Sequence, residues 1–392
     1  DCATGRCKNT VEALISLFSG PVEKEFLKEK NLEPEQLAFR IKDFISKSKQ
    51  PSPETGDNSK DSYYEKQNPP YKSKYGIPFD TLDELKLVQG WDDEAVTRGY
   101  LALSAACLTT TFVITQRTGA CQRIANSGNA AVIDRWLPRL LSGEVFATVG
   151  ISHLTTSRRH LAQPVLKAEE RPGGYVLDGY SPWVTGAPFA DVVVLGATLD
   201  DGRQLLIALP MELDGVTTPE PPTLVGLSAS QTGPVKLDQV FVPDENVLAG
   251  PVHEVMKQGV GGNTGGRQTS TLAIGVADAA IAFVEQEAGQ RADLGDPASS
   301  LRAEWAELRD DLLQLTRGTD VCSNEQLRTR ANSLALRASQ ASLAAAKGAG
   351  YVIGHPAARW CREALFFLVW SCPQPVMNAN LCELAGIQAD LA

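Results

Sequence analysis

The sequence has few histidines, no closely paired cysteines and no long apolar run. Its 392 residues include 4 His and 8 Cys, and no two Cys form a CxxC pair, so the spacing does not indicate a zinc site. No run of about 18–20 apolar residues is present, which argues against a membrane-spanning helix. The opening residues, DCATGRCKNT, lack the basic, apolar and small-residue pattern of a signal peptide.

Positive charge is also scarce. The chain holds 37 Lys and Arg against 47 Asp and Glu, a net charge of −10, which argues against a general nucleic-acid or anionic-membrane partner. We therefore expect a cytoplasmic protein without a membrane span or a nucleic-acid partner. Its cysteines should be reduced, and Cys107, Cys121 and Cys361 are expected to pack as small hydrophobes.

The remaining composition is ordinary but changes along the chain. Hydrophobic residues make up 43% and charged residues 21%, and this length allows a core of two or three layers. Residues 1–75 contain 11 Lys and 2 Arg, whereas residues 76–392 contain 5 Lys and 19 Arg. Two interpretations remain open: a natural helical N-terminus with a variable loop, or joined segments of different origin.

The first part of the chain predicts short helices and then an irregular stretch. Residues 11–49 have apolar residues at helical spacing, and Gly20-Pro21 and Pro34 divide them into three helices. Residues 46–76, SKSKQPSPETGDNSKDSYYEKQNPPYKSKYG, are polar and rich in Pro. This composition predicts a linker or a mobile loop.

From Trp91 onward the pattern runs from helices to strands and back to helices. Residues 92–145 predict helices, residues 146–250 alternate with period 2 around Gly and Pro turns, and residues 266–350 predict long amphipathic helices. We therefore predict an α+β fold with a central antiparallel β-domain. Its parts are a helical segment with a polar linker (1–75), an N-terminal helical domain (76–145), the β-domain (146–255) and a C-terminal helical bundle (256–392).

One β-domain stretch suggests a ligand. In GGYVLDGYSPWVTGAPFADVVVLGA, residues 173–197, Trp183 and Thr185 follow a hairpin turn, and an apolar strand comes after them. A flat ring system such as a flavin needs an aromatic wall and oriented donors at its polar edge. A Trp in the core and a Thr on a strand would account for the same two residues. This stretch, following RWLPRLLSGEVFATVGIS at 135–152, resembles the acyl-CoA dehydrogenase superfamily. The resemblance implies that Trp183 packs beside the isoalloxazine and that Thr185 bonds near its reactive nitrogen.

The resemblance assigns further cofactor-binding residues. In ISHLTTSRRH, Ser152 stands at the position of a family Thr that addresses the flavin pyrimidine edge, while His153, Leu154 and Arg158 depart from the pattern. Hydroxyls suit that edge because it presents carbonyl oxygens. Arg158 and Arg159 could meet phosphates of a nucleotide-like ligand or form a solvated pair.

The C-terminal half carries further similarity. QEAGQRADLGD places Arg291 at a family Arg that reaches FAD phosphates across the dimer, with Leu294 replacing a Phe. AAAKGAGYVIGHPAARWCREA, residues 344–364, resembles a glycine-rich family stretch, in which Gly348 and Gly350 would allow close approach to the cofactor. Lys347 and Ala349 depart from it, and Arg362-Glu363 approximates a family Arg-Asp pair. The resemblance implies FAD, a homodimer or homotetramer, and a small-molecule substrate such as an acyl-CoA.

The catalytic base of such dehydrogenases is not found at either usual position. Residues 366–381, FFLVWSCPQPVMNANL, contain no acid, and Ser371 or Cys372 stands near the expected Glu. On the helix that opens the C-terminal domain the first acid is Asp278, which lies too deep, and Glu285 and Glu287 come later. A hydroxyl or thiol would need a partner that lowers its pKa, and His355 before Pro356 is more typical of a turn cap.

Three classes of function therefore remain open. The first is a flavin oxidoreductase, acting either as an acyl thioester dehydrogenase with an unlocated base or as a monooxygenase that needs no acyl base. The second is a redox-silent binding or assembly subunit. The third is an unrelated helical scaffold in which Trp183 and Thr185 are core residues.

Overall fold

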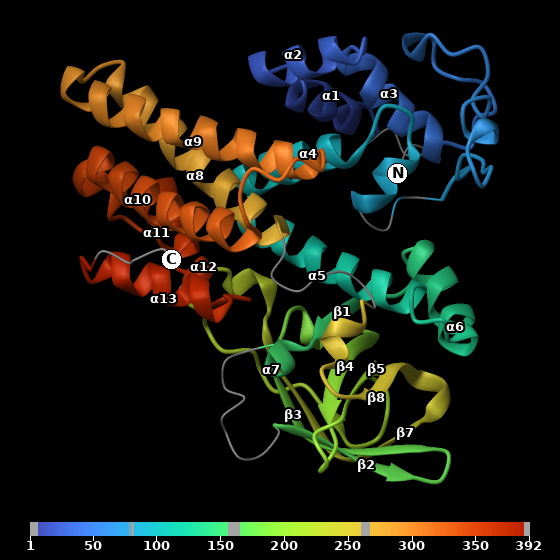
Figure 1. Ribbon diagram of the computed structural model, residues 1–392. Coiled ribbons are helices and arrows are strands. Elements are labelled where there is room, and N and C mark those ends of the chain that lie inside the picture. The colour runs from blue at the N-terminus through green and yellow to red at the C-terminus, as the bar shows by residue number, and fades with distance from the viewer. Residues whose placement is uncertain (1–6, 78, 80–81, 156–164, 260–266, 388–392) are drawn as a thin grey trace. The chain divides into compact units, whose positions relative to one another are not determined.

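The computed structural model describes residues 7–77, 79, 82–155, 165–259 and 267–387 (Figure 1). Its residues group into two compact units: residues 1–98 with 138–144, and residues 99–137 with 145–392. We call them unit 1 and unit 2 and describe each separately. Along the chain, α4 (Asp93–Ala106) and α6 (Ala130–Leu141) each contribute residues to both units.

Unit 1 begins with the three expected helices, which are α1 (Cys7–Leu17), α2 (Pro21–Glu29) and α3 (Pro34–Ile45). Pro21 and Pro34 each occupy a first helical position, where the missing N–H has no intrahelical partner to lose. A capping box between Glu33 and Gln36 fixes the start of α3. The ring of Phe18 packs edge-on against Trp91, with centroids 5.1 Å apart.

The polar stretch that follows α3 is packed rather than a free linker. It contains only short 3₁₀ turns, which are η2 (Pro53–Thr55) and η3 (Tyr64–Lys66), and a further turn, η4 (Leu82–Leu87), comes after it. Lys60 and Asp61 are buried. The ammonium of Lys60 donates to the carbonyls of Ser46 and Ser48 at 2.6 and 2.8 Å, and Asp61 accepts from the backbone N–H and the hydroxyl of Ser73. These buried polar groups hold a segment that has little apolar surface of its own.

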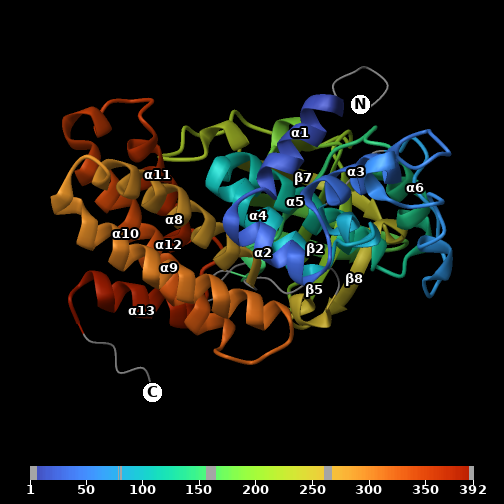
Figure 2. The same cartoon turned by 90° about the horizontal axis from the view of Figure 1, so that it is seen from above.

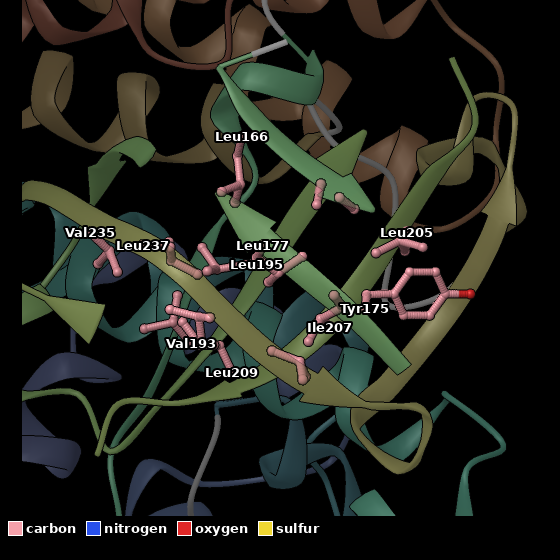
Figure 3. Packing of buried hydrophobic residues seen from close by; sticks show 14 of the residues in the cluster. Leu166, Tyr175, Leu177, Val193, Leu195, Leu205, Ile207, Leu209, Val235 and Leu237 are labelled. Carbon is pink, nitrogen blue, oxygen red and sulfur yellow. The ribbon is translucent and has the colours of Figure 1, made fainter. Parts of the chain in front are cut away.

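Unit 2 contains the expected strands of the β-domain. Its strands are β1 (Ala147–Gly150), β2 (Leu166–Arg171), β3 (Gly174–Val184), β4 (Val192–Thr198), β5 (Gln204–Pro210), β6 (Val216–Thr217), β7 (Gly233–Pro243) and β8 (Val247–Val252). The sheet order is β6-β7-β3-β2-β4-β5-β8, and β1 pairs with β4. Most neighbours are antiparallel, but β1 and β2 each pair parallel with β4. Figure 3 shows the buried leucines and valines of these strands, including Leu177, Leu195 and Leu205, packed together.

Along the chain, the helices of unit 2 come before, within and after the β-domain. They are α5 (Leu108–Ala125), α7 (Ser152–Thr155), α8 (Arg267–Ala288), α9 (Gly295–Thr316), α10 (Asn324–Gly350), α11 (Pro356–Ala364), α12 (Phe366–Val369) and α13 (Gln374–Leu384). In both views α8, α9 and α10 lie side by side (Figure 1; Figure 2). The indole N–H of Trp305 on α9 donates to the carbonyl of Ile274 on α8 at 3.1 Å. Across the described residues, no helix combines the length and apolar character needed to cross a bilayer.

Candidate functional site

Trp183 lies near the end of β3 with its ring partly in solvent. It is 45% exposed, although the neighbouring Val184 is fully buried. The pairing of β3 with β7 shifts register between Ser181 and Val184, and such an irregularity redirects the side chains of a strand. The ring is therefore not needed to complete the core of the β-domain and can cover one face of a ligand.

Thr185 lies under the surface, in a chain of three hydroxyls. It is 1% exposed, and its hydroxyl is 3.1 Å from that of Thr232, which is 2.8 Å from that of Ser230. The carbonyl of Ser230 also accepts from the N–H of Gly186 at 2.9 Å. Sequence reasoning did not identify Ser230 and Thr232, although the hydroxyl-rich SASQT at 228–232 carries the signal. The Thr185 hydroxyl is thus buried and bonded within the chain. Its contact with a flavin stays a prediction.

Ser152 begins α7, one residue after the end of β1, and α7 packs against β3, the strand that carries Trp183. His153, which departs from the family pattern, has a structural role: its Nε2 lies 2.6 Å from the carbonyl of Gly196 on β4, so that nitrogen carries the proton and donates. Burial lowers the pKa of His153 below its ordinary value. Arg158 and Arg159 lie outside the described residues.

The loop before β7 connects this part of the β-domain with α11. A Cβ added to Gly226 would lie 2.9 Å from the carbonyl oxygen of Arg362 and 3.5 Å from the backbone N of Glu363. Only glycine allows such an approach between two backbones. Four residues later the same loop supplies Ser230 to the hydroxyl chain, so α11 and the end of β3 are tied together by one short segment.

Glu363, at the tight contact with Gly226, is a buried acid that sequence reasoning treated only as half of an Arg-Asp-like pair. It is 4% exposed, and the Nε of Arg359 lies 3.9 Å from its carboxylate. Burial raises the pKa of Glu363 to about 7, while Arg359 and Arg362 act in the opposite direction. At neutral pH this carboxyl can therefore both hold and release a proton.

The other acids named from the sequence are committed to ion pairs. Asp278 and Glu285 both bind Arg302, at 2.6 and 2.8 Å, and Glu287 lies 3.8 Å from Arg291. His355 caps α11, because its Nδ1 accepts from the N–H of Ala357 at 3.2 Å. The capping role expected from its position before Pro356 is thus confirmed.

Ser371 and Cys372 lie beside a buried cation. The guanidinium of Arg328 is 1% exposed and donates to the carbonyls of Phe367 and Trp370, at 3.4 and 3.2 Å. The pKa of Cys372 is raised by burial and only partly lowered by Arg328. A thiol held protonated in this way is a poor base, so Cys372 does not replace the missing Glu.

The C-terminal residues predicted to touch FAD lie at one end of α10. Arg291 donates to the carbonyl of Ala345 at 2.6 Å and lies 3.6 Å from Asp293. Lys347 has φ 54° and interrupts the helix, and a Cβ on Gly348 would meet nothing within 4 Å. The structure therefore brings Arg291 and Gly348 to the same turn but binds the Arg291 side chain within this chain. Their contact with FAD stays a prediction.

Comparison with known proteins shows similarity to acyl-CoA dehydrogenases. Benzylmalonyl-CoA dehydrogenase of Aromatoleum aromaticum is 25% identical over 298 residues, 70% of this chain and 75% of that protein. Isovaleryl-CoA dehydrogenase of Solanum tuberosum is 25% identical over 270 residues, 64% of this chain and 65% of that protein. A solved glutaryl-coenzyme A dehydrogenase superposes with a TM-score of 0.65 at 19% identity, covering 77% of this chain and 82% of that one. These similarities support membership of the acyl-CoA dehydrogenase superfamily.

The sequence similarity to these dehydrogenases covers only part of this chain. A probable acyl-CoA dehydrogenase of Bacillus subtilis, YngJ, is 32% identical over 155 residues, which span only 40% of that protein. Residues 19–102 instead match the family model described as Type II secretion system (T2SS), protein K. The match falls in the Lys-rich part of the chain and ends near the boundary of unit 1.

The residues at the end of β3 fit the cofactor of this superfamily in part. An exposed indole at Trp183 suits a flat apolar ring system, and the hydroxyl of Ser152 suits its polar edge. The Thr185 hydroxyl is bonded to that of Thr232, and either of the two can be the donor. Within the described ranges no group of three or more His, Cys, Asp or Glu residues could hold a metal ion.

Proposed function

We propose that this protein is an FAD-dependent oxidoreductase that acts on an acyl thioester. The observation that carries the proposal is the half-exposed Trp183 at a strand end, two residues before Thr185, whose buried hydroxyl is linked to those of Thr232 and Ser230. The named relatives act on CoA thioesters, as the names benzylmalonyl-CoA and isovaleryl-CoA dehydrogenase state, and one neighbouring structure was solved with FADH2.

In this proposal the chain's own residues bind and orient the cofactor. Trp183 covers one face of the ring system and excludes water from it, while the Ser152 hydroxyl donates to the pyrimidine edge. Arg291, Gly348 and Gly350 bind the phosphate end. When bound, FAD supplies a two-electron hydride acceptor.

We also propose a homodimer or homotetramer. Tyr351, Val352 and Ile353 are consecutive apolar residues that are 86%, 61% and 92% exposed. Val369 on α12 is 78% exposed. Exposed apolar residues gathered on one part of a chain are typical of an interface, and here they follow the turn that carries Gly348.

The test is anaerobic reduction of the full chain, reconstituted with FAD, by a panel of acyl-CoA esters. The proposal predicts loss of flavin absorbance near ~450 nm with at least one ester. Bound flavin that no ester reduces would move the assignment to oxygen chemistry or to another electron donor. A chain that takes up no FAD would contradict the proposal and favour a redox-silent subunit.

A further inference from the structure

The proposed oxidation needs a group that removes the α-proton of the thioester, and the usual positions offer none. Residues 366–381 contain no acid. On α8 the acids Asp278 and Glu285 are held by Arg302. The base, if the reaction occurs, must therefore come from another element.

Glu363 is the only buried carboxylate among the described residues of unit 2. It shares the inner face of α11 with Trp360, whose ring lies against Phe283 of α8, with centroids 5.9 Å apart. No hydrogen-bond donor of the described chain reaches its carboxylate, and only Arg359 approaches, at 3.9 Å. A carboxylate with open acceptor positions in an apolar setting is suited to receive a proton.

The surroundings of Glu363 connect it with the proposed cofactor site. Its backbone N lies at the contact with Gly226, in the loop that continues to Ser230 and Thr232. On its other side α11 leads into α12, where Phe366 stacks on Trp370, with centroids 5.4 Å apart and an interplanar angle of 17°. Both rings are half-buried and meet Phe112 of α5 edge-on. This apolar surface suits the acyl part of a thioester.

We propose that Glu363 is the general base of this protein, an inference that rests on the function proposed above. The bond between the α-carbon and its hydrogen breaks, and the proton forms a new O–H bond on the Glu363 carboxylate. Bound FAD would supply the acceptor for the β-hydrogen and its bonding pair, a two-electron oxidation that would leave an α,β-enoyl thioester. The oxidation of the thioester is therefore balanced by the reduction of the flavin.

The electrostatics of the site are consistent with this role. Burial raises the pKa of Glu363 to about 7, and the charged groups that act on it among the described residues are Arg359 and Arg362, both on α11. On α8 the ring of Phe283 contacts Trp360 and His355 of α11. An acid near neutrality loses and regains its proton at working pH, which general-base catalysis requires.

The test separates proton removal from flavin reduction. Phenylacetyl-CoA has acidic α-hydrogens but no β-hydrogen that can leave as hydride, so its α-hydrogens can exchange with D₂O without oxidation. The full chain with FAD should exchange them, and Glu363→Gln should slow the exchange by about 10²–10⁴-fold, the range for a general base. Glu363→Asp should restore part of the rate. Glu325→Gln, at an exposed acid on α10, should change nothing.

A second readout does not depend on substrate turnover or on FAD. The infrared C=O band of a protonated carboxyl should titrate near pH 7 in the wild type, because the pKa of Glu363 is raised to about 7, and should be missing in Glu363→Gln. Unchanged exchange in Glu363→Gln, or no such band in the wild type, would overturn the inference. FAD uptake and reduction in a Glu363→Gln variant that equals the wild type would overturn it while leaving the proposed function intact. Failure of the wild type to bind FAD would instead contradict the proposed function.

Discussion

Individual side chains carry the functional argument, and Trp183 is the first to test. Trp183→Ala removes the proposed wall of the cofactor site without opening the core, since the ring is already 45% exposed. We expect FAD to bind about 10-fold more weakly, the effect of losing about 1.4 kcal/mol of aromatic contact. Fluorescence titration with FAD measures the dissociation constant.

Tyr180 provides the matched control for this prediction. It lies on the same strand and is also 45% exposed, so Tyr180→Ala removes a comparable surface ring at a position that is not predicted to contact FAD. Equal effects of the two substitutions on FAD affinity would show that Trp183 has no special role. Circular dichroism should confirm that both variants keep the fold.

Glu363 should make the free energy of unfolding depend on pH. The pKa of Glu363 is about 7 when folded and near its ordinary value of 4.5 when unfolded, so the folded state binds the extra proton between these values. Its contribution to stability is present below pH 4.5 and is lost as the pH rises through 7. Between pH 5 and 8 we expect Glu363→Gln to gain about 1–3 kcal/mol relative to the wild type. Urea unfolding across this range measures the difference, and a constant difference would contradict the raised pKa.

At the scale of elements, the loop of residues 221–232 joins α11 with the end of β3. Gly226→Ala would place a Cβ 2.9 Å from the carbonyl oxygen of Arg362, a backbone atom that cannot turn away. We expect unfolding free energy to fall by about 1–3 kcal/mol and FAD affinity to fall with it, because Ser230 and Thr232 lie on the same loop. Gly295→Ala, at a helical position with open space, is the control. Loss of stability without any change in FAD affinity would separate the loop from the site.

Local sequence signals predicted the elements better than their contacts. Pro21 and Pro34 mark the starts of α2 and α3 because proline loses no hydrogen bond there, and the period-2 pattern marks the strands. The burial of Glu363 and the bond between Thr185 and Thr232 were not predicted, since both depend on residues far apart in sequence. The stretch of residues 46–76 was read as a linker because its polar composition hides the buried network of Lys60 and Asp61.

At the scale of the whole molecule, two units of different composition share one chain. Unit 1 includes most of the residues that match secretion-system protein K, and unit 2 contains the proposed FAD site. We expect calorimetry to show two unfolding transitions. Because a ligand stabilises only the unit that binds it, FAD at 100 times its dissociation constant should add about 2.7 kcal/mol to the transition of unit 2 alone. A single transition that shifts as a whole would contradict independent units.

The central claim is that this chain binds FAD at the end of β3. The most direct measurement is the visible absorption spectrum of the purified full chain, incubated with excess FAD and then freed of unbound cofactor. We predict flavin bands near ~370 and ~450 nm with about one FAD per chain, and a lower FAD content in Trp183→Ala. A colourless protein would contradict it, and Trp183 would then be an exposed surface residue of a protein without redox chemistry.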